Sequence, residues 1–221
     1  MSGFSWDWAY AWSVVPHLVE GFIITVQATV LGSIVALLLG LLWTMVRLAE
    51  IPLLSPVVAL FVQFIRGTPF LVQLFFLFYV MPHYGLTLSP LATGVIAIGL
   101  FYSAYASEVY RAGIEGIPAG QWEACLTLGL PVGKVWTGVI LPQALRIVTP
   151  MLGNYVIVMF KETALLSTIT VTELLHQAMD AALAQYRYIE PLTLVGAFYF
   201  AISYVCALGV RYLERRGGAR G

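Results

Sequence analysis

The sequence predicts an all-α integral membrane protein with five transmembrane helices. Of its 221 residues, 60% are apolar and only 10% are charged, whereas soluble domains average about half apolar and about a quarter charged. Five stretches also reach the length of about 20 apolar residues that a helix needs to cross the hydrocarbon core. The alternating pattern of a transmembrane barrel is absent, so helices are the expected spanning structure.

The five predicted spans are all mainly apolar and cover about 21–46, 56–81, 91–110, 148–169 and 191–212. The second is interrupted by Arg66-Gly67-Thr68-Pro69. Thr68 and Pro69 have the residue types typical of a helix N-cap and first turn. We therefore expect the second helix to break near Gly67, close to a membrane interface.

The distribution of Lys and Arg predicts the orientation. Only Arg187 lies in a loop on the side opposite the C-terminus, while Arg66 and Lys161 fall inside predicted spans. The other eight lie on the side of the C-terminus: Arg47, Arg111, Lys134, Arg146, Arg211, Arg215, Arg216 and Arg220. Positive charge marks the cytoplasmic side. We expect a multi-pass protein of a bacterial inner membrane, with its N-terminus outside and its C-terminus in the cytoplasm.

The two ends of the chain are expected to flank one transmembrane domain over residues 17–215. Residues 1–16 lack a basic region and a cleavage site, so they do not resemble a removed signal peptide. Their alternating Trp and Tyr residues predict a periplasmic segment lying at the membrane surface. Residues 216–221 are basic and glycine-rich, which predicts a solvated cytoplasmic tail.

Intrinsic chemistry is not expected from this sequence. Cys125 and Cys206 are isolated, with no metal-ligand spacing around them. There is no combination of nucleophile, base and orienting group, and no phosphate-cradling glycine loop. We predict no catalytic residue, no metal and no cofactor, and nothing indicates a nucleic-acid partner.

The long connection between the third and fourth spans, residues 111–149, is the main candidate for a functional element. A short helix is predicted over 117–129, with Pro118 early in it and Gly129 as a left-handed terminator. A second is predicted from Pro131 towards Val139, broken or redirected by Pro142. The result would be a compact helix-turn-helix on the cytoplasmic face.

Residues 115–142 of this connection resemble the EAA loop of ABC importer permeases. Glu123-Ala124-Cys125 is followed after three residues by Gly129, and after nine more by Val139, Ile140 and Leu141-Pro142. The family pattern has alanine where Cys125 stands and isoleucine where Val139 stands. Blocks at 66–74, 108–114 and 161–167 are similar to those of the polar amino acid permease group, so the resemblance covers roughly residues 17–215.

This resemblance implies the fold of a type I ABC importer permease, with a cytoplasmic coupling helix. It implies that a separate ATPase subunit, two copies per complex, docks on Glu123, Ala124, Cys125, Gly129, Val139, Leu141 and Pro142. Further implied partners are a second permease chain, identical or homologous, a periplasmic or lipid-anchored solute-binding protein, and membrane lipid. The implied substrates are polar amino acids or zwitterionic compatible solutes such as ectoine, and the chain itself would hydrolyse no ATP.

Four ionisable residues fall in or near the predicted spans: Arg66, Glu108, Lys161 and Glu162. A charge inside the bilayer costs at least about 2.5–3.5 kcal/mol, so each needs a partner or a water-lined path. A zwitterionic amino acid could be held by Lys161 and Glu162, or by Arg66 and Glu108. Purely structural roles are the alternative, a helix break for Arg66 and a packing pair or loop anchor for Glu108.

Two other function classes stay open from sequence alone. An ion-coupled secondary transporter or channel would use Lys161, Glu162 and Glu108 as a relay, but the inverted repeat typical of such proteins is not visible. A membrane scaffold without transport is the third class. In the outer loop after the fourth span, Glu173 and Asp180 share a predicted helix face with His176, which is either solvated or meets a binding protein.

Overall fold

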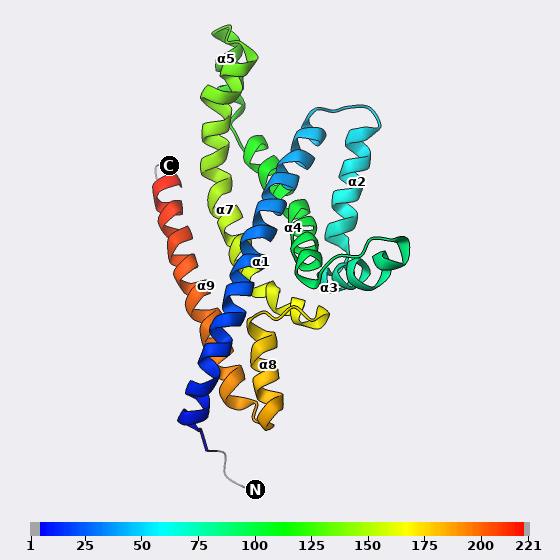
Figure 1. The fold of residues 1–221 in the computed structure, drawn as a ribbon. Coiled ribbons are helices and arrows are strands. Elements are labelled where there is room, and N and C mark those ends of the chain that lie inside the picture. Colours follow the sequence, from blue (N-terminus) through cyan, green and yellow to red (C-terminus); the bar gives the residue numbers. More distant parts are fainter. Residues whose placement is uncertain (1–4, 219–221) are drawn as a thin grey trace.

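The computed structural model describes residues 5–218, and its regular elements are all helical over that range (Figure 1). The long helices are α1 (Trp8–Leu48), α4 (Pro90–Glu115), α7 (Leu141–Glu162) and α9 (Ile189–Gly218). Shorter α-helices are α2 (Leu54–Gly67), α3 (Phe70–Phe75), α5 (Ala119–Thr127), α6 (Val132–Lys134) and α8 (Leu174–Gln185). The π-helical turns η1 (Phe76–Val80) and η3 (Val135–Ile140) and the 3₁₀ turns η2 (Met81–Tyr84) and η4 (Thr163–Ile169) join them.

The membrane-spanning helices agree with the predicted fold class. Four helical stretches of the described chain are long and apolar enough to cross a bilayer: 8–48, 90–115, 132–169 and 189–215. Helix α2 and the segment Phe70–Tyr84 pass the same test together, bent by 105° at the break between them. Counting this bent pair as one span gives the predicted five.

Figure 1 places the ends of the elements on two sides of the bundle. The beginning of α1 and helix α8 lie at one end. The loop from α1 to α2, the end of α9 and α5 lie towards the other, with α5 beyond the rest. An arrangement of this kind is expected of an odd number of crossings.

Small residues on α1 allow α1 and α4 to pack closely. The buried face of α1 carries a small residue at every fourth position, namely Ala28, Gly32, Ala36, Gly40 and Thr44. A Cβ atom added at Gly40 would lie 2.7 Å from the Ala106 Cβ and 2.9 Å from the Ser103 backbone oxygen. Such stripes let helix backbones approach within a membrane, where apolar side chains gain little by leaving lipid.

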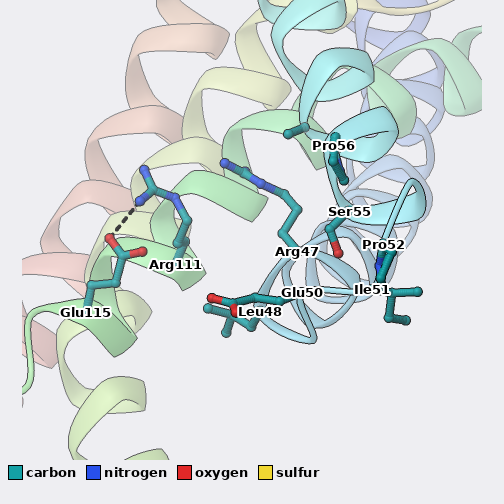
Figure 2. Close-up of a pocket in the computed structure, with 10 residues that line it drawn as sticks. Arg47, Leu48, Glu50, Ile51, Pro52, Ser55, Pro56, Arg111 and Glu115 are labelled. Atoms are coloured by element: carbon teal, nitrogen blue, oxygen red, sulfur yellow. Dashed lines mark hydrogen bonds and ion pairs between the residues drawn. The ribbon is translucent and has the colours of Figure 1, made fainter.

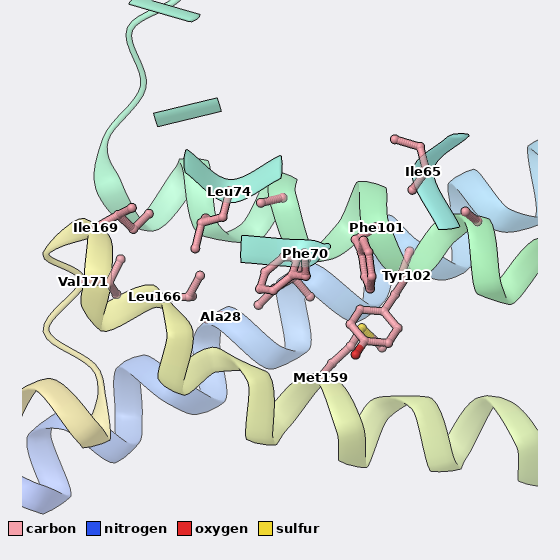
Figure 3. Close-up of a cluster of buried hydrophobic side chains, with 14 of the residues drawn as sticks. Ala28, Ile65, Phe70, Leu74, Phe101, Tyr102, Met159, Leu166, Ile169 and Val171 are labelled. Atoms are coloured by element: carbon pink, nitrogen blue, oxygen red, sulfur yellow. The ribbon is translucent and has the colours of Figure 1, made fainter. Parts of the chain in front are cut away.

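The central core lies where the broken helix α2–α3 crosses α4 and meets α1, α7 and η4 (Figure 3). Phe70 and Leu74 of α3 and Phe101 and Tyr102 of α4 are buried there, and Met159 of α7 lies beside Tyr102. The bend in the second span thus brings α3 onto the middle of α4. This packing sets the position of the charged and aromatic groups described below.

Helix α1 begins earlier than the sequence predicted. Its N-cap is Asp7, whose carboxylate accepts a hydrogen bond from the Tyr10 backbone amide at 3.1 Å. Residues 8–16 are therefore the first turns of α1, and their place at the membrane surface stays a prediction. At the other end α9 runs to Gly218, and the rest of the predicted tail, 219–221, lies outside the described residues, as do 1–4.

Candidate functional site

The first candidate site is α5, which projects from the end of the bundle (Figure 1). Pro118 is the N-cap of α5. Gly129 lies just after the C-cap residue and has a left-handed φ of +62°. The Leu130 amide reaches back to the Cys125 carbonyl at 3.1 Å, closing the helix end with the hydrogen bond of a Schellman motif. The predicted short helix and its glycine terminator are confirmed.

The residues of the EAA-like pattern do not share one surface. Glu123, Ala124, Gly129, Leu141 and Pro142 are exposed. Cys125 is only 3% exposed and Val139 is half-buried, so these two positions face the base of α5. Three apolar residues at the tip are also exposed and were not predicted as part of the site: Leu126, Leu128 and Val132, whose exposed fractions are 80%, 73% and 74%.

Helix α5 is fastened to the start of the fourth span. Trp122 and Trp136 meet edge to face with ring centroids 5.5 Å apart. Beneath them a small apolar cluster has Ile117, Ile140 and Ala144 as its buried members. The exposed apolar tip is thus carried by a packed base on a helix that continues into the membrane.

The prediction that Pro142 breaks or redirects the second short helix is wrong. Residues 132–169 form one continuous helical stretch, in which η3 comes immediately before α7 and Pro142 lies in the first turn of α7. Proline in a regular α-helix clashes with the carbonyl four residues earlier and removes a hydrogen bond. The π-turn changes the spacing of those carbonyls, so the helix continues through the proline.

The second candidate site is centred on Glu108, which three arginines from three helices surround. The Arg47 guanidinium of α1 and the Arg111 guanidinium of α4 each lie 2.7 Å from the Glu108 carboxylate. Arg66, at the end of α2, is 3.6 Å from it. Glu108 thus ties α1, α2 and α4 together just before α4 leads into α5. Arg66 and Glu108 are brought together, one of the two pairings that the sequence allowed.

Lys161 and Glu162, the other predicted pair, point in different directions. Lys161 is exposed, whereas Glu162 lies beside the Tyr102 hydroxyl, within hydrogen-bonding reach. One Glu162 carboxylate oxygen is buried without a hydrogen-bond partner among the described residues. A buried acceptor of this kind is costly unless something donates to it, which makes Glu162 the better candidate for a ligand contact.

Aromatic rings join these charges across the bundle. Three tyrosine rings form a group in which every pair of ring centroids is 5.9–6.0 Å apart: Tyr102, Tyr105 and Tyr155. The Arg66 guanidinium lies 5.4 Å from the centre of the Tyr105 ring. The tyrosine group on α4 and α7 therefore links Arg66 of the broken helix to Glu162 of α7. Sequence analysis missed it, although Tyr102 and Tyr105 lie three residues apart and hence on one face of a helix.

The helix break at Gly67 is confirmed, with one correction, while its place close to a membrane interface stays a prediction. Helix α2 ends at Gly67, but Pro69 rather than Thr68 is the N-cap of α3. The Thr68 hydroxyl instead donates back to the Phe64 carbonyl and accepts from the Gln73 side-chain amide at 2.6 Å. The Gln73 carbonyl oxygen is buried without a partner among the described residues. A mainly apolar cavity of about 340 Å³ lies beside this break.

The predicted exposed face of Glu173, His176 and Asp180 is also corrected. Glu173 is fully buried and caps α8, accepting hydrogen bonds from the Leu175 and His176 amides. The Tyr199 hydroxyl donates to the same carboxylate at 2.9 Å. Burial raises the pKa of the Glu173 carboxyl above its usual range. His176 and Asp180 do share a face of α8, and the His176 Nε2 atom lies 3.4 Å from the Asp180 carboxylate.

Comparison with known proteins identifies the family. The family model described as "Binding-protein-dependent transport system inner membrane component" matches residues 36–217. The chain belongs to this family. Members serve transport that depends on a solute-binding protein, which decides against the ion-coupled transporter, the channel and the scaffold left open by sequence.

Relatives within the family match almost the whole chain. A probable amino-acid ABC transporter permease of Sinorhizobium fredii is 41% identical, over 96% of this chain and 94% of that protein. The L-cystine transport permease of Bacillus subtilis is 38% identical, over 94% and 92%. A crystal structure titled as an amino acid ABC transporter with histidines superposes with a TM-score of 0.92 at 33% identity, covering 96% of this chain and 100% of that one.

Proposed function

We propose that the chain is the permease subunit of an ATP-driven importer for polar amino acids or related zwitterionic solutes. The observation that carries this proposal is α5, which holds an EAA-like pattern and an exposed apolar tip on a packed base. The names of the relatives, which include amino-acid, L-cystine, arginine and glutamine permeases, support the substrate class.

In this proposal α5 docks on a separate ATPase subunit. Leu126, Leu128 and Val132 enter an apolar groove of the partner, while Glu123 makes a charge-assisted hydrogen bond at its edge. Ala124 and Gly129 are small, so the two backbones come close. Cys125 and Val139 act from beneath, as part of the packed base rather than of the contact.

Movement of α5 is then transmitted by two routes. The Trp122–Trp136 contact couples α5 to the continuous helix 132–169, which crosses the membrane. The short segment between Glu115 and Ala119 joins α5 to α4 and so to Glu108 with its three arginines. ATP binding by the partner favours one of two arrangements of these helices, because the docked contacts differ between them.

The substrate path in this proposal passes Glu162 and the tyrosine group. The unpartnered Glu162 oxygen accepts a hydrogen bond from the substrate ammonium, and the tyrosine faces favour the same cation. Arg66 is 42% exposed and already contacts Tyr105, so it is placed to meet a carboxylate. Lys161, being exposed on another side, is assigned to a neighbouring chain or to lipid headgroups.

The assembly around the chain follows from the same reasoning. Two permease chains, identical or homologous, enclose the path, since one bundle of this size forms only part of a wall. Two ATPase subunits bind at the cytoplasmic α5 end, and a periplasmic or lipid-anchored solute-binding protein delivers substrate at the α8 end. The N-terminus is then outside and the C-terminus cytoplasmic, in agreement with the charge distribution.

The docking proposal is tested by co-purification of this chain with a co-expressed ABC-type ATPase subunit. Glu123→Arg is expected to abolish both co-purification and uptake, since it reverses an exposed charge on α5. Glu214→Arg, at an exposed glutamate near the end of α9, is the matched control and should leave both unchanged. Unaltered assembly and uptake in Glu123→Arg would refute the docking role.

A further inference from the structure

A pocket of about 470 Å³ lies between the α1–α2 loop and the end of α4 (Figure 2). Arg47, Glu50 and Ser55 line it from the side of α1 and α2, and the ion pair Arg111–Glu115 lines it from α4, with Arg111 Nη1 2.6 Å from Glu115. This volume is within the range of about 300–1,000 Å³ typical of small-ligand sites. The proposed transport mechanism uses Arg47 and Arg111 only through their ion pairs with Glu108 and leaves the pocket itself unassigned.

The charges around this pocket balance and are only partly used. Three arginines and three glutamates gather here: Arg47, Arg66, Arg111, Glu50, Glu108 and Glu115. Glu50 is exposed and forms no ion pair with any described residue. Among hydrogen bonds within the described chain, Arg47 donates from Nη1 alone. A balanced site with an unused carboxylate and unused guanidinium donors suits a ligand that carries both charges, rather than an anion.

The rest of the lining is apolar and lies on the end of α1, the α1–α2 loop and the start of α2. Leu48, Ile51, Pro52, Pro56 and Ala59 complete the pocket wall. Ile51 is 43% and Leu53 84% exposed, which is expected of side chains that meet lipid at a membrane interface. Glu50 and Leu53 have positive φ values of 49° and 70°, a conformation that non-glycine residues seldom adopt. The loop is thus held in an unusual conformation that turns Glu50 towards the pocket side.

We propose that this pocket binds the headgroup of a phospholipid that carries a phosphate and a primary ammonium. The phosphate lies against Arg47, whose Nε and Nη2 are not used in hydrogen bonds within the described chain. Arg111 already donates to Glu108 and Glu115, so it contributes mainly its nearby positive charge. The ammonium lies between Glu50 and Glu115. The glycerol backbone and first acyl carbons rest on the apolar wall, from which the chains pass into the bilayer. Basic pockets between membrane helices at the cytoplasmic side bind anionic lipid headgroups; the two glutamates of this pocket favour a zwitterionic headgroup instead.

Lipid in this pocket would brace the helices that lead to α5. The headgroup bridges the α1–α2 loop to the last turn of α4, and α5 begins four residues after Glu115. The site itself does not depend on the proposed transport function, because its ligand is recognised by charges on this chain alone. Lipid binding and ATPase docking can therefore fail separately.

The test measures lipid retention by the purified full-length chain, using native mass spectrometry from detergent. Three lipids with the same acyl chains are compared: phosphatidylethanolamine, phosphatidylglycerol, which lacks the ammonium, and phosphatidylcholine, whose ammonium has no N–H donor. Wild type is expected to retain phosphatidylethanolamine about two- to fivefold better than the other two, the upper part of the range for one partly exposed charged contact. Free glutamine should not displace it.

Variants assign the contacts. Glu50→Gln should lower the retention of phosphatidylethanolamine to that of phosphatidylglycerol. Glu115→Gln should have the same effect, because it removes the charge of the other carboxylate. Glu20→Gln, an exposed glutamate on the opposite end of the same helix α1, should keep the wild-type preference. Equal retention of all three lipids by wild type, an unchanged preference in both pocket variants, or displacement by glutamine would each overturn the proposal.

Discussion

Replacing Gly40 with alanine tests the close packing of α1 on α4. The new Cβ would lie 2.7 Å from the Ala106 Cβ, 2.9 Å from the Ser103 oxygen and 3.1 Å from the Ser107 nitrogen. Two of these are backbone atoms of α4, which no side-chain rotation can move. The helices must therefore separate by several tenths of an ångström over the contact.

The expected change in the free energy of unfolding has two opposing contributions. Overpacking a close contact costs about 1–3 kcal/mol, while alanine gains about 1 kcal/mol over glycine within a helix. Gly196→Ala is the matched control, because Gly196 lies within α9 and has nothing within 4 Å of its added Cβ. The difference between the two variants removes the propensity term and leaves the packing cost of about 1–3 kcal/mol.

The assay is thermal unfolding of both variants in the same detergent. At about 2–4 °C per kcal/mol for a chain of this size, Gly40→Ala should unfold about 2–12 °C below Gly196→Ala. Equal midpoints, or a higher midpoint for Gly40→Ala, would refute the close approach of α1 and α4. Far-ultraviolet circular dichroism before heating checks that both variants are folded alike.

Three further predictions concern the charged and coupling residues. Glu108→Gln removes the counter-charge of three arginines and should lower stability by about 2–4 kcal/mol, somewhat less than for a fully buried pair because Glu108 is 22% exposed; an unchanged unfolding midpoint would contradict this. The raised pKa of Glu173 means that folding favours its protonated form, so this contribution is complete below the unfolded pKa of about 4.5 and is lost as pH rises through the folded value. Subtracting the pH profile of thermal stability of Glu173→Gln from that of wild type should reveal this fall, and a flat difference would count against it. Trp136→Ala removes the ring contact with Trp122 at the base of α5 and should retain ATPase co-purification while uptake falls at least severalfold; parallel loss of both would mean that the base is part of the docking surface.

Several features of the fold could be predicted because they depend on local residue types. Twenty-residue apolar stretches predicted the spans, and the Gly67 break and the Gly129 terminator were readable from neighbouring turn residues. Pro142 was misjudged because the π-turn before it has no distinct sequence signal. The early start of α1 was not predicted either, because aromatic residues are compatible with both an interfacial segment and the first turns of a helix.

The candidate sites depend on tertiary contacts that sequence reasoning could only partly reach. Pairing of Arg66 with Glu108 was one of two combinations considered, but Arg47 and Arg111 as further partners require the crossing of α1 and α4. Glu173 looked like part of an exposed face because its residue type is polar. Its burial follows from α8 packing against α1 and α9, which no local pattern reveals.

The central claim is that α5 meets a cytoplasmic ATPase, and a photocrosslink in intact cells tests it most directly. A photoreactive amino acid replaces Leu126, 80% exposed at the tip of α5, or Leu183, 49% exposed on α8 at the other end of the bundle. If α5 docks on the ATPase, position 126 should crosslink to it and position 183 should not. A crosslink to the ATPase from position 183 alone would contradict both the docking role and the orientation.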